Sequence, residues 1–209
     1  MTRYGMAIDL KGCIGCHACS VACKSNNNLP NGIWYNTVVT DGGAYMDTAR
    51  GTYPNDLTRV YYPTSCMHCS NAACVEACPT GATFQREDGI VSINKDECIG
   101  CSACINACPY DVRTLLEGDP GYVVDFPLGD WDAPAHVANT MEKCTFCANR
   151  IDRGEKPACM EMCPGHARFW GDLDDPASEI SVFLEGKEYI RLLEDAGTEP
   201  NVFYVTSGY

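Results

Sequence analysis

The sequence contains no long hydrophobic run: no stretch approaches the roughly 18 apolar residues that a membrane-spanning helix requires. The first residues lack a twin-arginine pair and an extended apolar segment, so no export signal is expected. Positive charge is scarce, with 15 Lys and Arg against 28 Asp and Glu and a formal net charge of −13. A chain this acidic is not expected to bind nucleic acid or anionic lipid through its overall field.

Motifs for nucleotide and ester chemistry are missing as well, because there is no G-x-G-x-x-G, no P-loop and no G-x-S-x-G. The charged fraction of 21% is too low for a disordered polyelectrolyte. The 209 residues therefore suit one globular domain or two small ones. Without its 16 cysteines the chain is only about 37% apolar, which is a thin supply for one large hydrophobic core.

Cysteine is the residue in excess, and its 16 copies form four groups of four with none left over. These are group I (Cys13, Cys16, Cys19, Cys23), group II (Cys66, Cys69, Cys74, Cys78), group III (Cys98, Cys101, Cys104, Cys108) and group IV (Cys144, Cys147, Cys159, Cys163). Groups I and III have the C-x-x-C-x-x-C-x-x-x-C spacing of bacterial ferredoxins. Group II widens the second gap to four residues and group IV to eleven, and proline directly follows groups II, III and IV.

Two other uses of cysteine fit this pattern less well. A disulfide scaffold needs an oxidising compartment and has no reason to repeat one spacing four times. Structural zinc takes pairs of cysteines in a four-ligand site, which does not call for three cysteines at this spacing, then a fourth, then proline. Both alternatives would give a colourless protein. The pattern instead predicts four [4Fe–4S] clusters with the sixteen cysteines as iron ligands.

The spacing also predicts which cysteines share a cluster. A tight loop with a cysteine at every third residue reaches three corners of a cubane, and the next cysteine lies one helical turn further and points at a neighbouring cluster. After group II, residues 80–85 lead through a Glu-Asp-Gly turn into a strand at residues 90–94. This predicted hairpin joins groups II and III into one ferredoxin-like module, residues 58–116.

The second module is predicted from internal symmetry. Ala167 and Phe169 follow Cys163 at the offsets at which Ala82 and Phe84 follow Cys78. A strand near residues 167–170 should therefore pair with one near residues 4–9 and bring groups I and IV together. The predicted domains are 1–57 plus 117–209 for this module and 58–116 for the other. The fold class is α+β, with two ferredoxin-like dicluster modules, short β-hairpins, helices and long loops.

Four ligand sets follow from this pairing. They are set A (Cys13, Cys16, Cys19, Cys163), set B (Cys144, Cys147, Cys159, Cys23), set C (Cys66, Cys69, Cys74, Cys108) and set D (Cys98, Cys101, Cys104, Cys78). Every cluster corner has a thiolate, so no iron is left open for catalysis. No catalytic residue is predicted, and the chain is expected to carry single electrons without being an enzyme by itself.

A few residues beside the cysteines have more than one interpretation. His17, His68 and His166 lie in the cluster motifs and are expected to be loop residues, with a proton-coupled effect on a cluster as the alternative. His136 is expected to be inert. Lys24 and Lys143 adjoin cysteines, where a cation would raise a cluster's potential, although a solvated surface lysine is as good an interpretation. Backbone N–H groups of the Cys-Ile-Gly-Cys loops are expected to offset cluster charge.

Two long insertions, residues 24–65 and 109–143, are rich in aromatic residues, which argues against disorder. They should cover the modules, with docking of a partner as the alternative. In the tail, Tyr189, Leu192 and Leu193 have helical spacing, and residues 201–205 are expected to form a strand that packs on the group I and IV module.

The residues also resemble a known family. The matching segments are residues 6–9, 13–24, 27–30, 142–147, 171–176 and 197–204. Together they are similar to the four-cluster iron–sulfur (beta) subunit of the dimethyl sulfoxide reductase family of molybdopterin oxidoreductases. That family includes subunits of dimethyl sulfoxide, arsenate, polysulfide and tetrathionate reductases and those paired with aromatic dehydroxylases. Some members replace one group III cysteine with Trp, whereas all four are present here.

The resemblance implies an electron-transfer subunit of anaerobic respiration. Its partner would be a large catalytic subunit holding bis-molybdopterin guanine dinucleotide, together with a membrane quinol-oxidising anchor subunit or a soluble donor. A partner's twin-arginine signal would place the chain on the extracytoplasmic face of the membrane, and without one it would be cytoplasmic. The alternative is a free-standing polyferredoxin, or an electron-transfer subunit of a hydrogenase or formate dehydrogenase.

Overall fold

The computed structural model describes residues 2–42 and 48–206, and within them short helices and strands alternate. This mixture of elements confirms an α+β fold class. The helices are α1 (Ala18–Asn26), α2 (Ala73–Glu76), α3 (Ala103–Asn106), α4 (Ala148–Asp152), α5 (Ala158–Glu161), α6 (Glu179–Leu184) and the short 3-10 helix η1 (Glu194–Ala196). The strands are β1 (Tyr4–Asp9), β2 (Asn36–Thr40), β3 (Tyr61–Ser65), β4 (Thr83–Gln85), β5 (Val91–Ile93), β6 (Thr114–Leu116), β7 (Thr140–Glu142), β8 (Arg168–Asp172), β9 (Tyr189–Ile190) and β10 (Val202–Val205).

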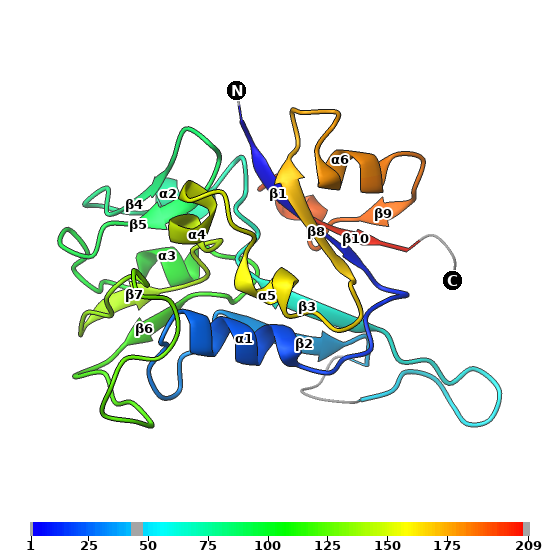
Figure 1. The fold of residues 1–209 in the computed structure, drawn as a ribbon, viewed down its shortest axis with the longest axis horizontal. Helices are drawn as coiled ribbons and strands as arrows, with labels where there is room; N and C mark the ends of the chain where they lie inside the picture. Colours follow the sequence, from blue (N-terminus) through cyan, green and yellow to red (C-terminus); the bar gives the residue numbers. More distant parts are fainter. Residues whose placement is uncertain (1, 43–47, 207–209) are drawn as a thin grey trace.

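A four-stranded sheet in the order β8-β1-β10-β9 joins the two ends of the chain (Figure 1). β1 pairs with β8 in antiparallel fashion, with Met6 opposite Trp170, so the pairing expected from internal symmetry is confirmed. β10 runs parallel to β1 and places Ile8 opposite Tyr204. The expected final strand is confirmed too, and it enters the sheet itself rather than only packing on it.

Three two-stranded ladders complete the sheet structure. The hairpin expected before group III is confirmed as β4 and β5, with Phe84 opposite Ser92. The β2–β3 ladder lies within the first long insertion, and β6–β7 pairs the two ends of the second. Each of these two ladders joins a strand from the range 58–116 to a strand from the rest of the chain. The ladders therefore tie the two predicted modules together.

The helix expected around Tyr189 and Leu192 is wrong. Tyr189 lies in β9 opposite Val205, and its ring packs edge-on against Phe203 at 5.1 Å between centroids. Leu193 has a left-handed φ of 47°, which does not continue a helix. Three apolar residues at helical spacing are too few to outweigh strand pairing, and the tail's helix is instead α6, which the Ser178 hydroxyl caps by accepting from Ser181 N at 3.2 Å.

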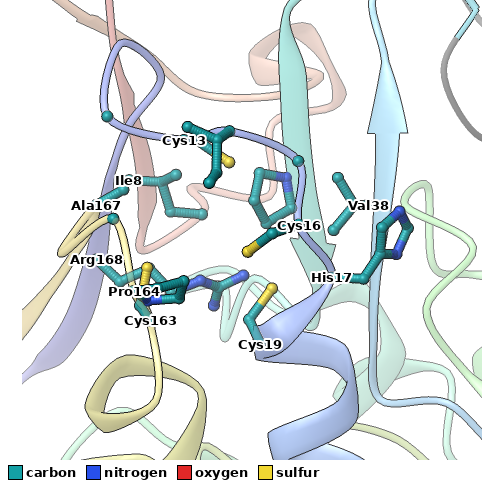
Figure 2. A pocket seen from close by; sticks show the side chains of 15 residues that line it. Ile8, Cys13, Cys16, His17, Cys19, Val38, Cys163, Pro164, Ala167 and Arg168 are labelled. Carbon is teal, nitrogen blue, oxygen red and sulfur yellow. The ribbon is translucent and has the colours of Figure 1, made fainter.

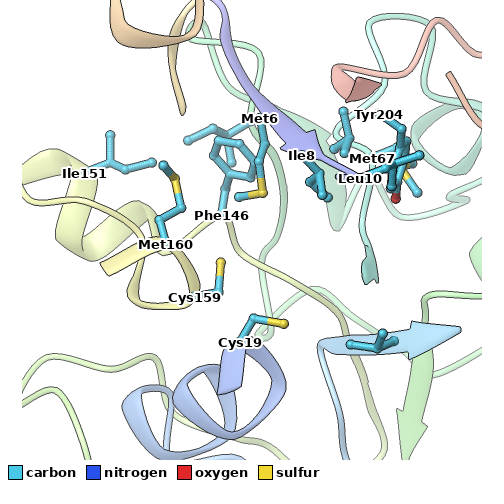
Figure 3. Packing of buried hydrophobic residues seen from close by; sticks show 13 residues of the cluster. Met6, Ile8, Leu10, Cys19, Met67, Phe146, Ile151, Cys159, Met160 and Tyr204 are labelled. Carbon is cyan, nitrogen blue, oxygen red and sulfur yellow. The ribbon is translucent and has the colours of Figure 1, made fainter. Parts of the chain in front are cut away.

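The main core lies between the sheet and helices α1, α4 and α5 (Figure 3). Met6 and Ile8 of β1 and Phe146 are almost completely buried in it. Cys19 of α1 and Cys159 of α5 are also members of this hydrophobic core. Two thiols that were predicted to bind different iron–sulfur clusters are thus held on neighbouring helices in the main hydrophobic core.

Candidate metal centres

The four cysteines of set A line one cavity of about 370 Å³ (Figure 2). Cys13 and Cys16 come from the loop after β1, Cys19 from the first turn of α1, and Cys163 from the turn after α5. The pairing of β1 with β8 brings these distant segments together. The donor chemistry is four thiols around one space, which fits an iron–sulfur cluster.

Sets C and D have the same arrangement. All four cysteines of set C line a cavity of about 330 Å³, and all four of set D line one of about 270 Å³. In each case three cysteines come from one group and the fourth from the other, as the spacing predicted. The structure therefore gathers twelve of the sixteen cysteines into three cavities with the predicted memberships.

Set B is more deeply buried. Cys23, Cys147 and Cys159 are buried, and Cys144 is half-buried. Burial raises the pKa of the Cys23 thiol well above its usual range, and the negative charge of Cys144, Cys147 and Cys159 adds to the shift. Cys144 packs against the buried residues around Cys23, and the charges of Cys144, Cys147 and Cys159 all act on Cys23, so the four thiols of set B lie in one region.

The two Cys-Ile-Gly-Cys loops share a left-handed backbone conformation that glycine adopts without strain. Gly15 has φ +68° and Gly100 has φ +65°, both left-handed. At Gly100 an added Cβ would overlap the backbone carbonyl oxygen of Asn139, so the loop lies against the chain with no room for a side chain. The sulfur atoms also receive backbone N–H donors, from Thr83 to Cys78 at 3.4 Å and from Phe146 to Cys144 at 3.3 Å.

Two buried arginines beside the thiols were missed by the sequence analysis. Arg113 is 4% exposed and its Nη2 donates to Cys74 Sγ at 2.9 Å. Arg168 is 5% exposed and its Nη1 donates to Cys159 Sγ at 3.4 Å. A signal was present, because both arginines stand five residues after a group's last cysteine in the pattern C-P-x-x-x-R.

The two lysines next to cysteines are not solvated surface residues. Lys143 is 3% exposed, and its Nζ donates to the carbonyls of Val91 and Cys144, the latter at 2.7 Å. Lys24 is half-buried, and its Nζ donates to three backbone carbonyls, with the one of Pro30 at 2.7 Å. Both ammonium groups are therefore fixed by backbone acceptors, and only Lys143 is enclosed on all sides.

The histidines differ in environment. His17 turns its ring away from the sulfur atoms of set A (Figure 2). His68 is 1% exposed and its Nδ1 accepts from Val91 N at 3.1 Å, which fixes the neutral ring with its proton on Nε2. Burial would raise the pKa of the Cys66 thiol, but the nearby charges of Lys143 and Arg113 lower it. Cys66 is thus poised as a thiolate.

His136 lies in a buried polar network, and its side chain is 3% exposed. Its Nδ1 lies 3.2 Å from Glu142 Oε1, and its Nε2 is 2.9 Å from the carbonyl oxygen of Asn27. Asn27 Nδ2 in turn donates to Cys23 Sγ at 3.5 Å. Tyr35 donates to the same Glu142 carboxylate. The second insertion therefore folds back onto set B.

The two long insertions, residues 24–65 and 109–143, partly cover the cysteine sets and partly form exposed surface. Tyr35 is buried against set B, whereas Trp34, Val123 and Trp131 are exposed to 45%, 82% and 85%. Trp34 and Val123 line a surface hollow of about 630 Å³. Cys16 and Cys101 are the two exposed cysteines, and each follows two residues after an isoleucine that is 65% exposed. Sets A and D therefore reach the surface.

Across the described ranges, no helix combines the length and the hydrophobicity that crossing a bilayer demands.

Comparison with known proteins agrees with this geometry. The family model of a 4Fe-4S dicluster domain matches residues 57–118 and 131–173, and that of a 4Fe-4S binding domain matches residues 13–27. A dimethyl sulfoxide reductase iron–sulfur subunit of Halobacterium salinarum is 43% identical over 98% of this chain and 79% of its own length. The chain belongs to the iron–sulfur subunits of the dimethyl sulfoxide reductase family.

Other relatives in this family have equally extensive similarity. The arsenate respiratory reductase iron–sulfur subunit of Shewanella sp. is 39% identical over 98% of this chain and 97% of its own length. A tetrathionate reductase subunit of Salmonella typhimurium is 40% identical over 97% of this chain and 72% of its own length. As a member of this family, the chain is a [4Fe–4S] protein that transfers electrons within a molybdopterin oxidoreductase, which confirms the function inferred from the sequence.

Proposed function

We propose that this iron–sulfur subunit holds four [4Fe–4S] clusters, one in each of the cysteine sets A, B, C and D. The observation that carries the proposal is that three separate cavities are each lined by four thiols drawn from two cysteine groups. Thiolate is the ligand that these clusters take, and set B offers the same donors. When bound, such clusters accept and release single electrons.

The sets stand in a row, which is the arrangement an electron conduit needs. Sets A and B meet at Cys19 and Cys159, which lie on adjacent helices (Figure 3). Cys66 of set C acts electrostatically on Cys144 of set B. Sets C and D share a neighbour in Arg113, which donates to Cys74 and to Thr83 beside Cys78. The proposed order is therefore A, B, C, D, with exposed Cys16 and Cys101 at the two ends.

The row divides into the two predicted modules, sets A and B in residues 1–57 plus 117–209 and sets C and D in residues 58–116. The β1–β8 ladder supports the first module and the β4–β5 hairpin supports the second. The chain itself positions, insulates and tunes the clusters and contributes no catalytic residue. Chemistry on the substrate takes place in the partner.

The proposed partner is a large catalytic subunit with bis-molybdopterin guanine dinucleotide. A membrane quinol-oxidising anchor subunit or a soluble donor would exchange electrons at the other end of the row. The relatives named as subunits of arsenate and tetrathionate reductases support a complex of this kind. Its proposed location is the extracytoplasmic face of the membrane when the partner carries a twin-arginine signal, and the cytoplasm otherwise.

The test is anaerobic purification of the native complex with quantification of metals by mass spectrometry. About sixteen irons per chain, with molybdenum or tungsten in fixed ratio to a large co-purifying chain, is the expected result. Sixteen irons without such a partner would point to a free-standing polyferredoxin instead. Fewer than about twelve irons in intact protein would contradict the four-cluster assignment.

A substitution separates electron delivery from substrate chemistry. Cys101→Ser removes one ligand of set D, whereas Ser102→Ala changes the adjacent residue and keeps all sixteen cysteines. Cys101→Ser should reduce turnover with the physiological donor and leave turnover with an artificial donor that reaches the catalytic subunit directly. Ser102→Ala should leave turnover unchanged with both donors. Undiminished turnover of Cys101→Ser with the physiological donor would refute the role of set D.

A further inference from the structure

Three cations are buried in the interior, although Lys and Arg are almost never fully buried unless paired. Arg113, Lys143 and Arg168 are 4%, 3% and 5% exposed. Within residues 2–42 and 48–206 none of them forms an ion pair with a carboxylate, whereas surface arginines such as Arg86 pair with Asp88 at 2.8 Å. Removing an unpaired charge from water is costly, so each of these side chains requires negative charge from another source.

Arg168 stands between sets A and B. Its side chain lines the cavity of set A and reaches between Cys163 and Cys19 (Figure 2). Its Nη1 donates to Cys159 Sγ of set B at 3.4 Å. Its Nη2 donates to Asn36 Oδ1 at 3.0 Å, which fixes the plane of the guanidinium. One positive charge therefore faces two thiol sets.

Lys143 stands between sets B and C. Its Nζ donates to the carbonyl of Cys144, a member of set B, at 2.7 Å. It also donates to the carbonyl of Val91, whose side chain lines the cavity of set C. The ammonium group is thus held between Cys144 of set B and Val91 beside the cavity of set C.

Arg113 stands between sets C and D. Its side chain lines the cavity of set C, and its Nη2 donates to Cys74 Sγ at 2.9 Å. Its Nη1 donates to Thr83 Oγ1 at 3.4 Å, and Thr83 lines the cavity of set D and donates its N–H to Cys78 Sγ. Each arginine thus donates to the third cysteine of a group, Cys74 or Cys159, and faces the two sets of one module.

At the two arginines the electrostatics of the thiols agree with this geometry, whereas at Lys143 burial outweighs the thiolates and lowers the pKa. Burial lowers the pKa of Arg113, but the thiolates of Cys74, Cys66 and Cys104 outweigh burial and raise it overall. The same holds for the pKa of Arg168, where burial is outweighed by Cys159 and Cys19. Each arginine is therefore stabilised by thiolates of two different sets.

We propose that Arg168, Lys143 and Arg113 form a series of fixed positive charges, one between each two successive clusters, and that each charge raises the reduction potentials of both clusters that flank it. The inference rests on the proposed four-cluster function. Reduction adds negative charge to a cluster, and a buried cation nearby stabilises that charge because the surrounding medium screens it weakly. A cation shared by two clusters acts on both and so shifts their potentials in the same direction.

The test is a potentiometric titration followed by EPR spectroscopy on the holo complex, with the variants Arg168→Gln, Lys143→Gln and Arg113→Gln. Each signal is assigned through a Cys→Ser substitution in its own set. Arg168→Gln should lower the potentials of clusters A and B, Lys143→Gln those of B and C, and Arg113→Gln those of C and D. A tenfold fall in the ratio of reduced to oxidised cluster at fixed ambient potential corresponds to a shift of 59 mV for a one-electron couple.

Arg86→Gln is the matched control, because it removes one positive charge from a partly exposed side chain that pairs with Asp88 and Asp152. It should leave all four potentials in place. The proposal is overturned when a variant with full iron content keeps all its potentials, shifts only one flanking cluster, or shifts all four equally. If a Gln variant loses iron, the charge-conserving variants Arg113→Lys and Arg168→Lys are measured instead. Both should retain the wild-type potentials, and lowered potentials in either one would overturn the proposal.

The same experiment distinguishes a failure of the charge series from a failure of the proposed four-cluster function. If the wild-type complex shows four EPR-active clusters but the Gln variants leave the potentials unchanged, only the proposed charge series is refuted. Wild-type complex without four clusters refutes the proposed function itself.

Discussion

Gly100 in the second Cys-Ile-Gly-Cys loop offers a stringent test of how tightly a cysteine loop is built into the fold. Its φ of +65° is a conformation that an L-residue adopts only at a cost of roughly 1–2 kcal/mol. A Cβ there would lie far inside the 3.0 Å that real Cβ contacts respect, against the carbonyl oxygen of Asn139. That carbonyl belongs to backbone, so relief requires the chain leading into β7 to move.

Gly81 is the matched comparison, since its φ is +73° and a Cβ there would meet nothing within 4 Å. Gly81→Ala should cost only the backbone term of about 1–2 kcal/mol. Gly100→Ala should cost this plus the roughly 1–3 kcal/mol typical of an overpacked site. The difference between the two variants therefore isolates the steric contact, because both lose the same conformational freedom.

Gly15, at the same place in the first loop, should fall between them. Its Cβ would meet the ring of Tyr61, a side chain that can move further than backbone. The expected order of destabilisation is Gly100→Ala, then Gly15→Ala, then Gly81→Ala. Unfolding of such proteins is often irreversible, so the half-life of the visible cluster absorbance at a fixed elevated temperature is the suitable measure.

If the extra cost of about 1–3 kcal/mol destabilises the native state and so lowers the barrier to unfolding by the same amount, Gly100→Ala should bleach roughly 5- to 150-fold faster than Gly81→Ala. Iron content at the start should be measured for each variant, so that failed assembly is separated from fast loss. Equal bleaching rates for the two variants at equal iron content would refute the close approach of the loop to Asn139.

Two further predictions concern a polar ligand neighbour and a surface carboxylate. Asn27→Leu removes the Nδ2 donor to Cys23 Sγ, so the potential of the set B cluster should fall in an EPR-monitored titration while that of set D stays; an unmoved set B signal would contradict the assignment of this donor. Burial opposes ionisation of Asp172, but backbone N–H donors such as that of Arg3 at 2.8 Å outweigh burial and lower its pKa. Its stabilising contribution is complete above the unfolded pKa of about 3.9 and is lost as pH falls through the folded pKa. Asp172→Asn should therefore lower thermal stability more at about pH 7 than near pH 3.5, measured as melting temperature of both proteins, and an equal loss at the two pH values would contradict it.

The chain shows which structural features a sequence reveals on its own. The memberships of sets A, C and D and the pairing of β1 with β8 were predictable, because cluster geometry forces a spacing and the two halves repeat it. These features depend on local pattern and symmetry. The helix expected at Tyr189 failed because strand pairing with Val205, an interaction between segments, decides that structure.

The polar interior was harder to predict for a related reason. A lone His136 in a long insertion has no local signature, and its contact with Glu142 arises only after the insertion folds back. Arg113 and Arg168 did have a signature, the shared C-P-x-x-x-R spacing, but burial of an arginine contradicts its ordinary preference for the surface. Only the negative charge of the clusters makes such burial reasonable.

That last point connects folding with electron transfer. The hydrophobic supply is thin, and the main core includes Cys19 and Cys159 among its members. The interior also holds the unpaired cations Arg113, Lys143 and Arg168, and an uncompensated buried charge costs about 3–5 kcal/mol. Three such charges approach the whole stability of an ordinary domain, about 5–15 kcal/mol. Negatively charged clusters at the thiols supply the missing countercharge, so the side chains that tune the potentials also make folding of this chain depend on loading its clusters.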